Sequence, residues 1–389
     1  MCRNVTSGVV VRPTGALLAL LSLAVTPTQA ELRTISSKYY ELHTDLDEAG
    51  AQEAVLRITL MAEEYHSRTR GLGGTVARRL PFYLFQKRAD YHAAGGMPGS
   101  AGVYMGNRLM AVTDPRNPAQ AWHTVQHEGF HQFADATIRG DLPIWANEGM
   151  AEYFGEGVFT GDQFYVGLIP PARLKRIQAG IRAGHFMPLG KMLSLSLYEW
   201  NAFLKFENYD QAWSMVHFLA HGENGRYEKA FMGFLRDIAR QIDRERAWQQ
   251  NFGADIAAFR KRWEEYWLRL PDDPTAALHA EIVTATLTSF YGRAIGQRQR
   301  FKTIEEFFDA AETGQLKMDS ENWLPPTLLN AAMKQAPEVG EWSLTKRGRN
   351  RLLTCTMSDG TQLFGRFKLS KRRVKSTWVD VKPARKKKR

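Results

Sequence analysis

Short apolar runs near the start of the chain predict strands with a helix between them. Residues 39–43 have the pattern of a strand, and apolar residues then recur at helical spacing between positions 51 and 61. Residues 81–85 form an almost continuous apolar run, which predicts a buried strand. The glycine-rich segment 95–100 predicts a loop, and residues 102–112 predict a further strand.

The middle of the chain has the pattern of helices. Residues 122–134 place apolar side chains at the spacings of a helix that packs in a core. Residues 141–144 (Asp-Leu-Pro-Ile) predict a turn that leads into a second helix. Residues 211–270 are mostly amphipathic and predict the helical half of the same domain, which ends at residues 271–274. Further helices are expected over residues 276–336.

A different pattern begins near residue 341. Residues 352–357, 361–369 and 377–381 predict a three-stranded meander, with a turn at residues 358–360. The order of elements along the whole chain therefore predicts an α+β fold. A mixed sheet with helices comes first, and a helical subdomain, further helices and a small C-terminal β-module follow.

The N-terminal residues have the pattern of a cleaved signal peptide. Arg3 and Arg12 precede an apolar run, Ala16–Val25, and the small-x-small ending Thr28–Ala30 follows it. The run is too short to span a hydrocarbon core of about 30 Å. The protein is therefore expected to be secreted or periplasmic. After cleavage only Cys355 of the two cysteines would remain, so no internal disulfide is expected.

Positive charge is concentrated at the C-terminal end. The whole sequence carries a net charge of +11, and residues 341–389 alone contain sixteen Lys and Arg residues against three acidic residues. Two interpretations remain open: a solvated basic end on a small β-domain, or binding to an anionic envelope polysaccharide or lipid surface. Nucleic acid is not expected as a partner, because export removes the chain from cytoplasmic DNA and RNA and no aromatic-interleaved motif is present.

The candidate chemistry lies in the H-E-x-x-H motif of His127, Glu128 and His131. In a helix, positions 127 and 131 lie one turn apart, so both imidazoles can bind one Zn²⁺ at about 2.0–2.1 Å. Glu128 can reach a water at the metal without being a ligand. Glu148 and Glu152 lie one turn apart on the next predicted helix; one can be the third ligand and the other can accept a hydrogen bond from a ligand imidazole. The alternative is a structural helix pair without a metal.

The longer pattern resembles the gluzincin metallopeptidases, and more narrowly the bacterial secreted peptidase-MA-like family DUF1570. That family has H-E-x-x-H-Q on a helix, a short loop, and then W-x-[NS]-E-G-x-A-E-Y-F. This chain has HEGFHQ at residues 127–132 and WANEGMAEYF at residues 145–154. The resemblance implies a thermolysin/gluzincin-like catalytic domain that hydrolyses peptide bonds in a peptide or protein substrate.

The resemblance also implies roles for individual residues. Zn²⁺ would be held by His127, His131 and Glu148, and Glu128 would be the general base. The two remaining candidates beside the ligands, Glu152 and Asn147, are expected to hydrogen-bond to them.

Tyr209 is the candidate donor for the oxyanion of the tetrahedral intermediate. In the aminopeptidase branch of the gluzincins a tyrosine some sixty residues past the glutamate ligand has this role, and Tyr209 falls 61 residues past Glu148. The alternative is an aromatic residue that packs against Trp213 at a helix start. If so, the role would pass to Tyr198, His123 or His185.

Two further features bear on the type of protein. His217 and His221 repeat the four-residue spacing without an adjacent carboxylate, so they are expected to be core or surface histidines. Gly106 stands where the aminopeptidases have a carboxylate for the substrate's amino terminus, which favours an endopeptidase. The alternative function is a catalytically silent protein with the peptidase fold that binds anionic partners through its basic C-terminal module.

These patterns divide the chain into a signal peptide (residues 1–30), a gluzincin-like metallopeptidase domain (31–275), a helical extension (276–340), a small basic β-meander (341–382) and a basic tail (383–389).

Overall fold

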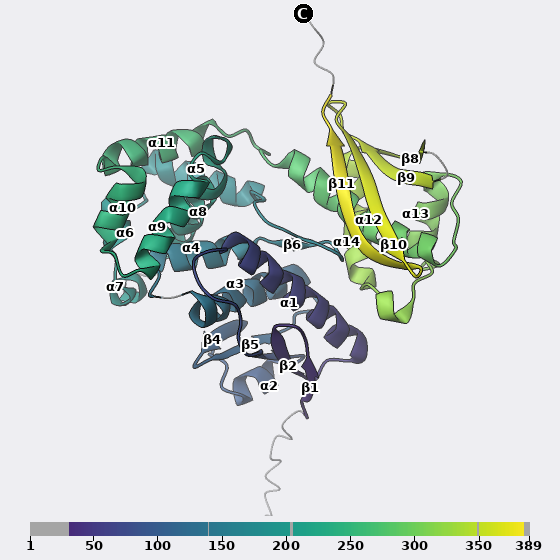
Figure 1. Cartoon of the computed structure of the whole chain (residues 1–389), viewed down its shortest axis with the longest axis horizontal. Coiled ribbons are helices and arrows are strands. Elements are labelled where there is room, and N and C mark those ends of the chain that lie inside the picture. Colours follow the sequence, from purple (N-terminus) through teal and green to yellow (C-terminus); the bar gives the residue numbers. More distant parts are fainter. Residues whose placement is uncertain (1–30, 139, 203–204, 348–349, 385–389) are drawn as a thin grey trace, which may run out of the picture.

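The computed structural model describes residues 31–138, 140–202, 205–347 and 350–384. The predicted signal peptide and most of the basic tail lie outside these ranges. The chain forms a mixed α+β structure with three regions: a sheet with its helices, a group of helices, and a C-terminal unit of helices and strands (Figure 1).

The first sheet has five strands in the order β1-β2-β3-β5-β4. The three inner strands are parallel, and the two edge strands run antiparallel to their neighbours. The strands are β1 (Arg33–Ser36), β2 (Tyr40–Thr44), β3 (Leu80–Phe85), β4 (Gly102–Met105) and β5 (Arg108–Val112).

The expectation of one strand over residues 102–112 is wrong, because this segment is a β-hairpin. Gly106 and Asn107 both have positive φ angles, 60° and 90°, and connect Met105 to its partner Arg108 in a two-residue turn. The fold-back leaves β4 at the edge of the sheet. The short helix α2 (Arg88–Ala93) and strand β1 also have no counterpart among the predicted elements.

Two long helices cover this sheet, as the hydrophobic pattern predicts. α1 (Glu48–Arg68) begins at Asp47, whose side chain accepts a hydrogen bond from Gly50 N. α3 (Pro118–Thr137) follows β5 and carries the H-E-x-x-H motif. The predicted apolar face of α1 is buried and includes Ala51, Ala54, Ile58 and Met61.

The second region is helical and continues the same hydrophobic core. Six tryptophans are fully buried there, which explains the aromatic content of this part of the sequence. Among the described residues, no helix here or elsewhere is both long and apolar enough to cross a membrane. The helices are α4 (Ile144–Gly155), α5 (Pro171–Ala183), α6 (Leu189–Ser194), α7 (Leu197–Ala202), α8 (Phe206–Gly225), α9 (Glu228–Ala239), α10 (Arg244–Phe252) and α11 (Ile256–Arg269).

The C-terminal unit contains a four-stranded antiparallel sheet, so the expectation of a three-stranded meander is wrong. The additional strand β8 pairs with β9 along its whole length. The sheet order is β11-β10-β9-β8. The elements are α12 (Ala276–Gly296), α13 (Ile304–Glu312), α14 (Pro326–Val339), β8 (Glu341–Arg347), β9 (Asn350–Thr356), β10 (Gln362–Ser370) and β11 (Arg373–Lys382).

The C-terminal strands pack directly on α12. A Cβ on Gly365 would lie 1.9 Å from Thr288 Oγ1, so only glycine allows β10 to approach the helix this closely. Helices and strands share one hydrophobic cluster, and removal of residues 341–389 would expose the buried side of α12 to water.

A short hairpin joins this unit to the rest of the chain. It consists of β6 (Val158–Phe159) and β7 (Phe164–Tyr165), and its turn contains Asp162. Arg293 of α12 binds both oxygens of Asp162, at 2.9 and 2.8 Å, and is itself buried.

Candidate metal centre

Three donor atoms from α3 and α4 come together at one point. His127 Nε2 lies 3.1 Å from His131 Nε2 and 3.4 Å from Glu148 Oε2. His131 Nε2 lies 3.6 Å from the same Glu148 oxygen. The helical spacing of the two histidines places both on one face of α3, and the turn before Ile144 brings α4 back across it.

These distances fit a single tetrahedral metal ion. In a tetrahedral site with bonds of about 2.0–2.1 Å, the donor atoms lie about 3.3 Å apart. The side chains of His127, His131 and Glu148 are 13%, 14% and 14% exposed, so the site is largely buried but reachable from solvent. Two imidazoles and one carboxylate leave a fourth position for water or substrate, as in catalytic zinc sites.

The other nitrogen of each imidazole has its own partner on α4. His127 Nδ1 lies 3.1 Å from Glu152 Oε1, and His131 Nδ1 lies 3.2 Å from Asn147 Oδ1. With a metal bound, each of these oxygens would accept a hydrogen bond from Nδ1–H, which leaves both Nε2 lone pairs free to face the metal. Glu152 and Asn147 therefore orient the two rings.

The electrostatics of the site follow from these contacts. Burial alone would lower the pKa of His127, but its bonds to Glu148 and Glu152 outweigh burial and raise the pKa to about 10. Burial would raise the pKa of Glu148, but the bonds from both histidines outweigh it and lower the pKa to about 2. In the metal-free protein, His127 therefore keeps a proton that is shared in hydrogen bonds with Glu148 and Glu152. A divalent cation that binds to His127 would displace this proton.

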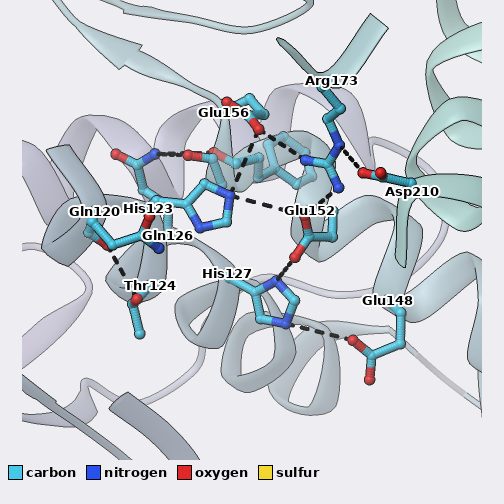
Figure 2. A network of polar contacts seen from close by, with 12 residues as sticks. Gln120, His123, Thr124, Gln126, His127, Glu148, Glu152, Glu156, Arg173 and Asp210 are labelled. Carbon is cyan, nitrogen blue, oxygen red and sulfur yellow. Dashed lines mark hydrogen bonds and ion pairs between the residues drawn. The ribbon is translucent and has the colours of Figure 1, made fainter. Parts of the chain in front are cut away.

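A buried arginine that sequence reasoning missed stands behind Glu152. Arg173 of α5 binds Glu152 at 2.5 Å, Glu156 at 2.8 Å and Asp210 at 2.9 Å (Figure 2). Its side chain is 5% exposed and also lies over the Trp213 ring. Arg173 thus links the partner of His127 to the start of α8.

The edge strand β4 contacts the H-E-x-x-H helix through Tyr104. The backbone N–H of Tyr104 donates to Glu128 Oε2 at 2.9 Å, and its hydroxyl donates to Asp135 Oδ2 at 2.6 Å. Gln132, the residue after the motif, donates to the carbonyls of Pro81 and Asn107. α3 is therefore held against three parts of the sheet, and the Glu128 carboxylate lies beside its edge.

Tyr209 lies in the first turns of α8, beside the donor cluster. Its ring is 6.4 Å from the His127 ring between centroids, and it packs edge-on against Trp200 at 5.6 Å. Burial, assisted by the Glu148 charge, raises the pKa of its phenol to about 12, so the hydroxyl keeps its proton. The ring contacts of Trp213 are with His217 and Trp267.

α8 reaches this position because α4 has no side chain at Gly149. A Cβ there would lie 2.5 Å from the Ala212 carbonyl oxygen and 2.7 Å from a Val216 methyl group. The glycine after the candidate ligand Glu148 therefore sets the separation between α4 and the helix that carries Tyr209.

Comparison with known protein families points to the same part of the chain. A family model described as "Protein of unknown function (DUF1570)" matches residues 121–243. No curated protein matches the chain. The DUF1570 match covers just under a third of the sequence, from α3 to the start of α10. It contains the three donor residues together with Glu128, Arg173 and Tyr209.

The remaining histidine candidates lie outside the donor group. His123 Nε2 lies 3.9 Å from both Glu152 and Glu156, on the side of the arginine network (Figure 2). His217 is buried and bonds to the Gly167 carbonyl, and His221 bonds to the Tyr153 hydroxyl. His185 and Tyr198 are exposed.

Proposed function

We propose that this protein is a zinc-dependent peptidase. The observation that carries the proposal is the triangle of His127 Nε2, His131 Nε2 and Glu148 Oε2, whose sides of 3.1, 3.4 and 3.6 Å suit one tetrahedral ion. The likeness of residues 127–132 and 145–154 to the gluzincin motifs supports the same conclusion. The DUF1570 match, to a family of unknown function, covers the two helices that carry these motifs. Bound zinc would supply a Lewis acid that polarises the scissile carbonyl and makes water a nucleophile at neutral pH.

Glu128 would act as the general base. It follows the first ligand on α3, and its carboxylate accepts a hydrogen bond from the Tyr104 N–H of strand β4. From there it would accept a proton from the attacking water and return it to the leaving amine. Tyr209, whose phenol stays protonated, would donate a hydrogen bond to the oxygen of the tetrahedral intermediate.

The substrate would bind as an extended strand beside β4. This strand is at the sheet edge, and the outward N–H of Tyr104 is taken by Glu128, so the strand and the base meet at one point. The β4–β5 turn at Gly106 and Asn107 offers no carboxylate for a substrate amino terminus. We therefore propose an endopeptidase of thermolysin/gluzincin-like architecture that acts in the cell envelope or outside the cell.

Substitution of Glu128 tests this proposal. Glu128→Gln removes the base but no metal ligand, so the variant should bind one zinc per chain and lose nearly all cleavage of a diverse peptide library. The matched control is Glu305→Gln, an exposed residue at the start of α13, which should cleave normally. If Glu128→Gln still cleaved peptides, Glu128 would not be the general base. If the wild-type protein did not bind zinc, the catalytically silent alternative would be supported.

A further inference from the structure

The cations of the C-terminal unit gather at one end of its sheet. Because β8 to β11 are neighbours in sequence order and antiparallel, the start of β9 lies at the same end of the sheet as the β10–β11 turn. We call the exposed cations there the basic end. They are Arg300, Arg351, Lys368, Lys371, Arg372 and Lys375.

Contacts with α12 show that three separate segments meet there. A Cβ on Gly296, the last residue of α12, would lie 2.1 Å from the Arg372 carbonyl oxygen. The Tyr291 hydroxyl donates to the Arg351 carbonyl at 3.4 Å. Burial raises the pKa of Tyr291, and the charges of Arg351 and Arg300 partly offset that rise, so both cations lie near this ring.

The basic end is not neutralised by acidic partners. The neighbouring Arg373 is paired with Asp319 and Glu321. Within the described ranges, no ion pair joins an acidic side chain to the six cations of the basic end. β11 runs away from this end and finishes at Lys382, so the chain enters its basic tail at the opposite end of the sheet.

The tip of the β10–β11 hairpin has an unfavourable backbone for the residues that occupy it. Lys371 and Arg372 have φ angles of 48° and 69°, the conformation of a two-residue turn that asparagine and glycine adopt most easily. Two long cationic side chains therefore stand at positions where the backbone favours small residues.

An exposed aromatic residue continues this surface along the outer face of the sheet. Trp378 is 42% exposed and lies directly opposite Arg366, so it is a diagonal neighbour of Lys368 on the same face. Arg366 is held by Asp380 at 2.8 Å. The basic tip, Lys368 and Trp378 lie along the hairpin and form a path, and Trp378 at its far end also lines a pocket with Tyr165 and Glu281.

We propose that this path binds an anionic polysaccharide. Arg and Lys at the basic end would pair with its carboxylate or phosphate groups, and the indole of Trp378 would stack on the apolar face of a sugar ring. A flat lipid surface would touch the tip, where the described residues offer no exposed large apolar side chain for insertion. An extended polymer can contact both the tip and Trp378. This binding is independent of the proposed peptidase site.

A variant that improves the turn separates binding from folding. Lys371→Asn/Arg372→Gly gives the hairpin its preferred residues, so the full-length protein should be at least as stable as wild type. Its affinity for immobilised polygalacturonate should fall about tenfold at low salt, because each cation that is removed takes away one ionic contact with the polymer. Trp378→Ala should also weaken binding, whereas Tyr198→Ala, at another exposed aromatic residue, should not.

The tail provides the matched control for charge. Lys387→Asn/Lys388→Gly removes the same charge and should keep affinity within about twofold of wild type. Equal losses from the tip and tail variants would overturn the proposal in favour of a net-charge effect. Binding to phosphatidylglycerol vesicles or a single-stranded oligonucleotide as tight as to polygalacturonate would overturn the choice of partner. Neutral dextran should not bind.

Discussion

Replacement of Arg173 by methionine should weaken both the fold and the metal site. The substitution keeps much of the side-chain volume but leaves Glu152, Glu156 and Asp210 without the cation that binds them at 2.5, 2.8 and 2.9 Å. Arg173 is 5% exposed, so solvent cannot replace it. Breaking a buried ion pair costs about 3–5 kcal/mol, and we expect a loss of free energy of unfolding in that range.

The same substitution should lower zinc affinity through Glu152. Loss of a residue that orients a metal ligand costs about 10–100-fold in affinity, and Arg173 acts one step behind such a residue, so we expect a loss of about tenfold. Competition with a chromophoric chelator measures this affinity, and urea unfolding of the metal-free protein measures stability. Arg173→Lys should recover part of the stability but not the fork that holds Glu152 and Asp210 together.

Arg293→Met separates the metal effect from general destabilisation. Arg293 is as buried as Arg173 and binds Asp162 through two bonds, but it lies in the C-terminal unit. It should lose a similar amount of stability and keep wild-type zinc affinity. If Arg173→Met and Arg293→Met changed zinc affinity equally, Arg173 would serve the fold alone and would not orient Glu152 for the metal.

Two further predictions concern Tyr209 and pH. Tyr209→Phe should lower kcat by about 10²–10³ with a smaller change in KM, as expected for a donor that acts in the transition state; a change confined to KM in steady-state kinetics would contradict this. Burial lowers the pKa of His217 to about 3, so below pH 6.5 the unfolded chain binds a proton that the folded chain does not. Stability should fall by about 1.4 kcal/mol per pH unit from this residue, and His217→Gln should flatten the slope of unfolding free energy between pH 6.5 and 4. Identical slopes would contradict this assignment.

The donor cluster could be predicted from sequence because its geometry is local. Two histidines one helical turn apart lie on the same face of a helix, whatever surrounds that helix. The connection between Thr137 and Ile144 is short, so α4 must pack back across α3. Asn147 and Glu152 follow from the same two helices. Strongly periodic helices and continuous apolar strands were predictable for similar reasons.

The contacts that come from distant segments could not be predicted. Arg173 meets Glu152 and Asp210 only after α5 and α8 pack together, and nothing in its local sequence distinguishes it from a surface arginine. The β4–β5 turn was missed because Gly106 and Asn107 interrupt one apolar stretch without the usual length of a loop. Strand β8 has an alternation that could have predicted it, because Trp342 and Leu344 pack against the core while the polar residues between them are exposed. The alternation covers only residues 341–345 before cationic residues begin, so the strand was missed.

The contact between Gly149 and α8 changes what the sequence motif means. A methyl group on the residue after Glu148 would clash with the Ala212 carbonyl, so the size of this residue limits how closely α4 and α8 can pack. A distant relative could keep both histidines and the glutamate yet carry a larger residue at this place. Such a chain would still bind a metal, but its helix α8 would lie further from α4, and the residue that corresponds to Tyr209 could not reach the metal site. When sequences are compared, a glycine at this position therefore indicates that the tyrosine can reach the metal site. A larger residue there indicates a protein that binds a metal without the tyrosine.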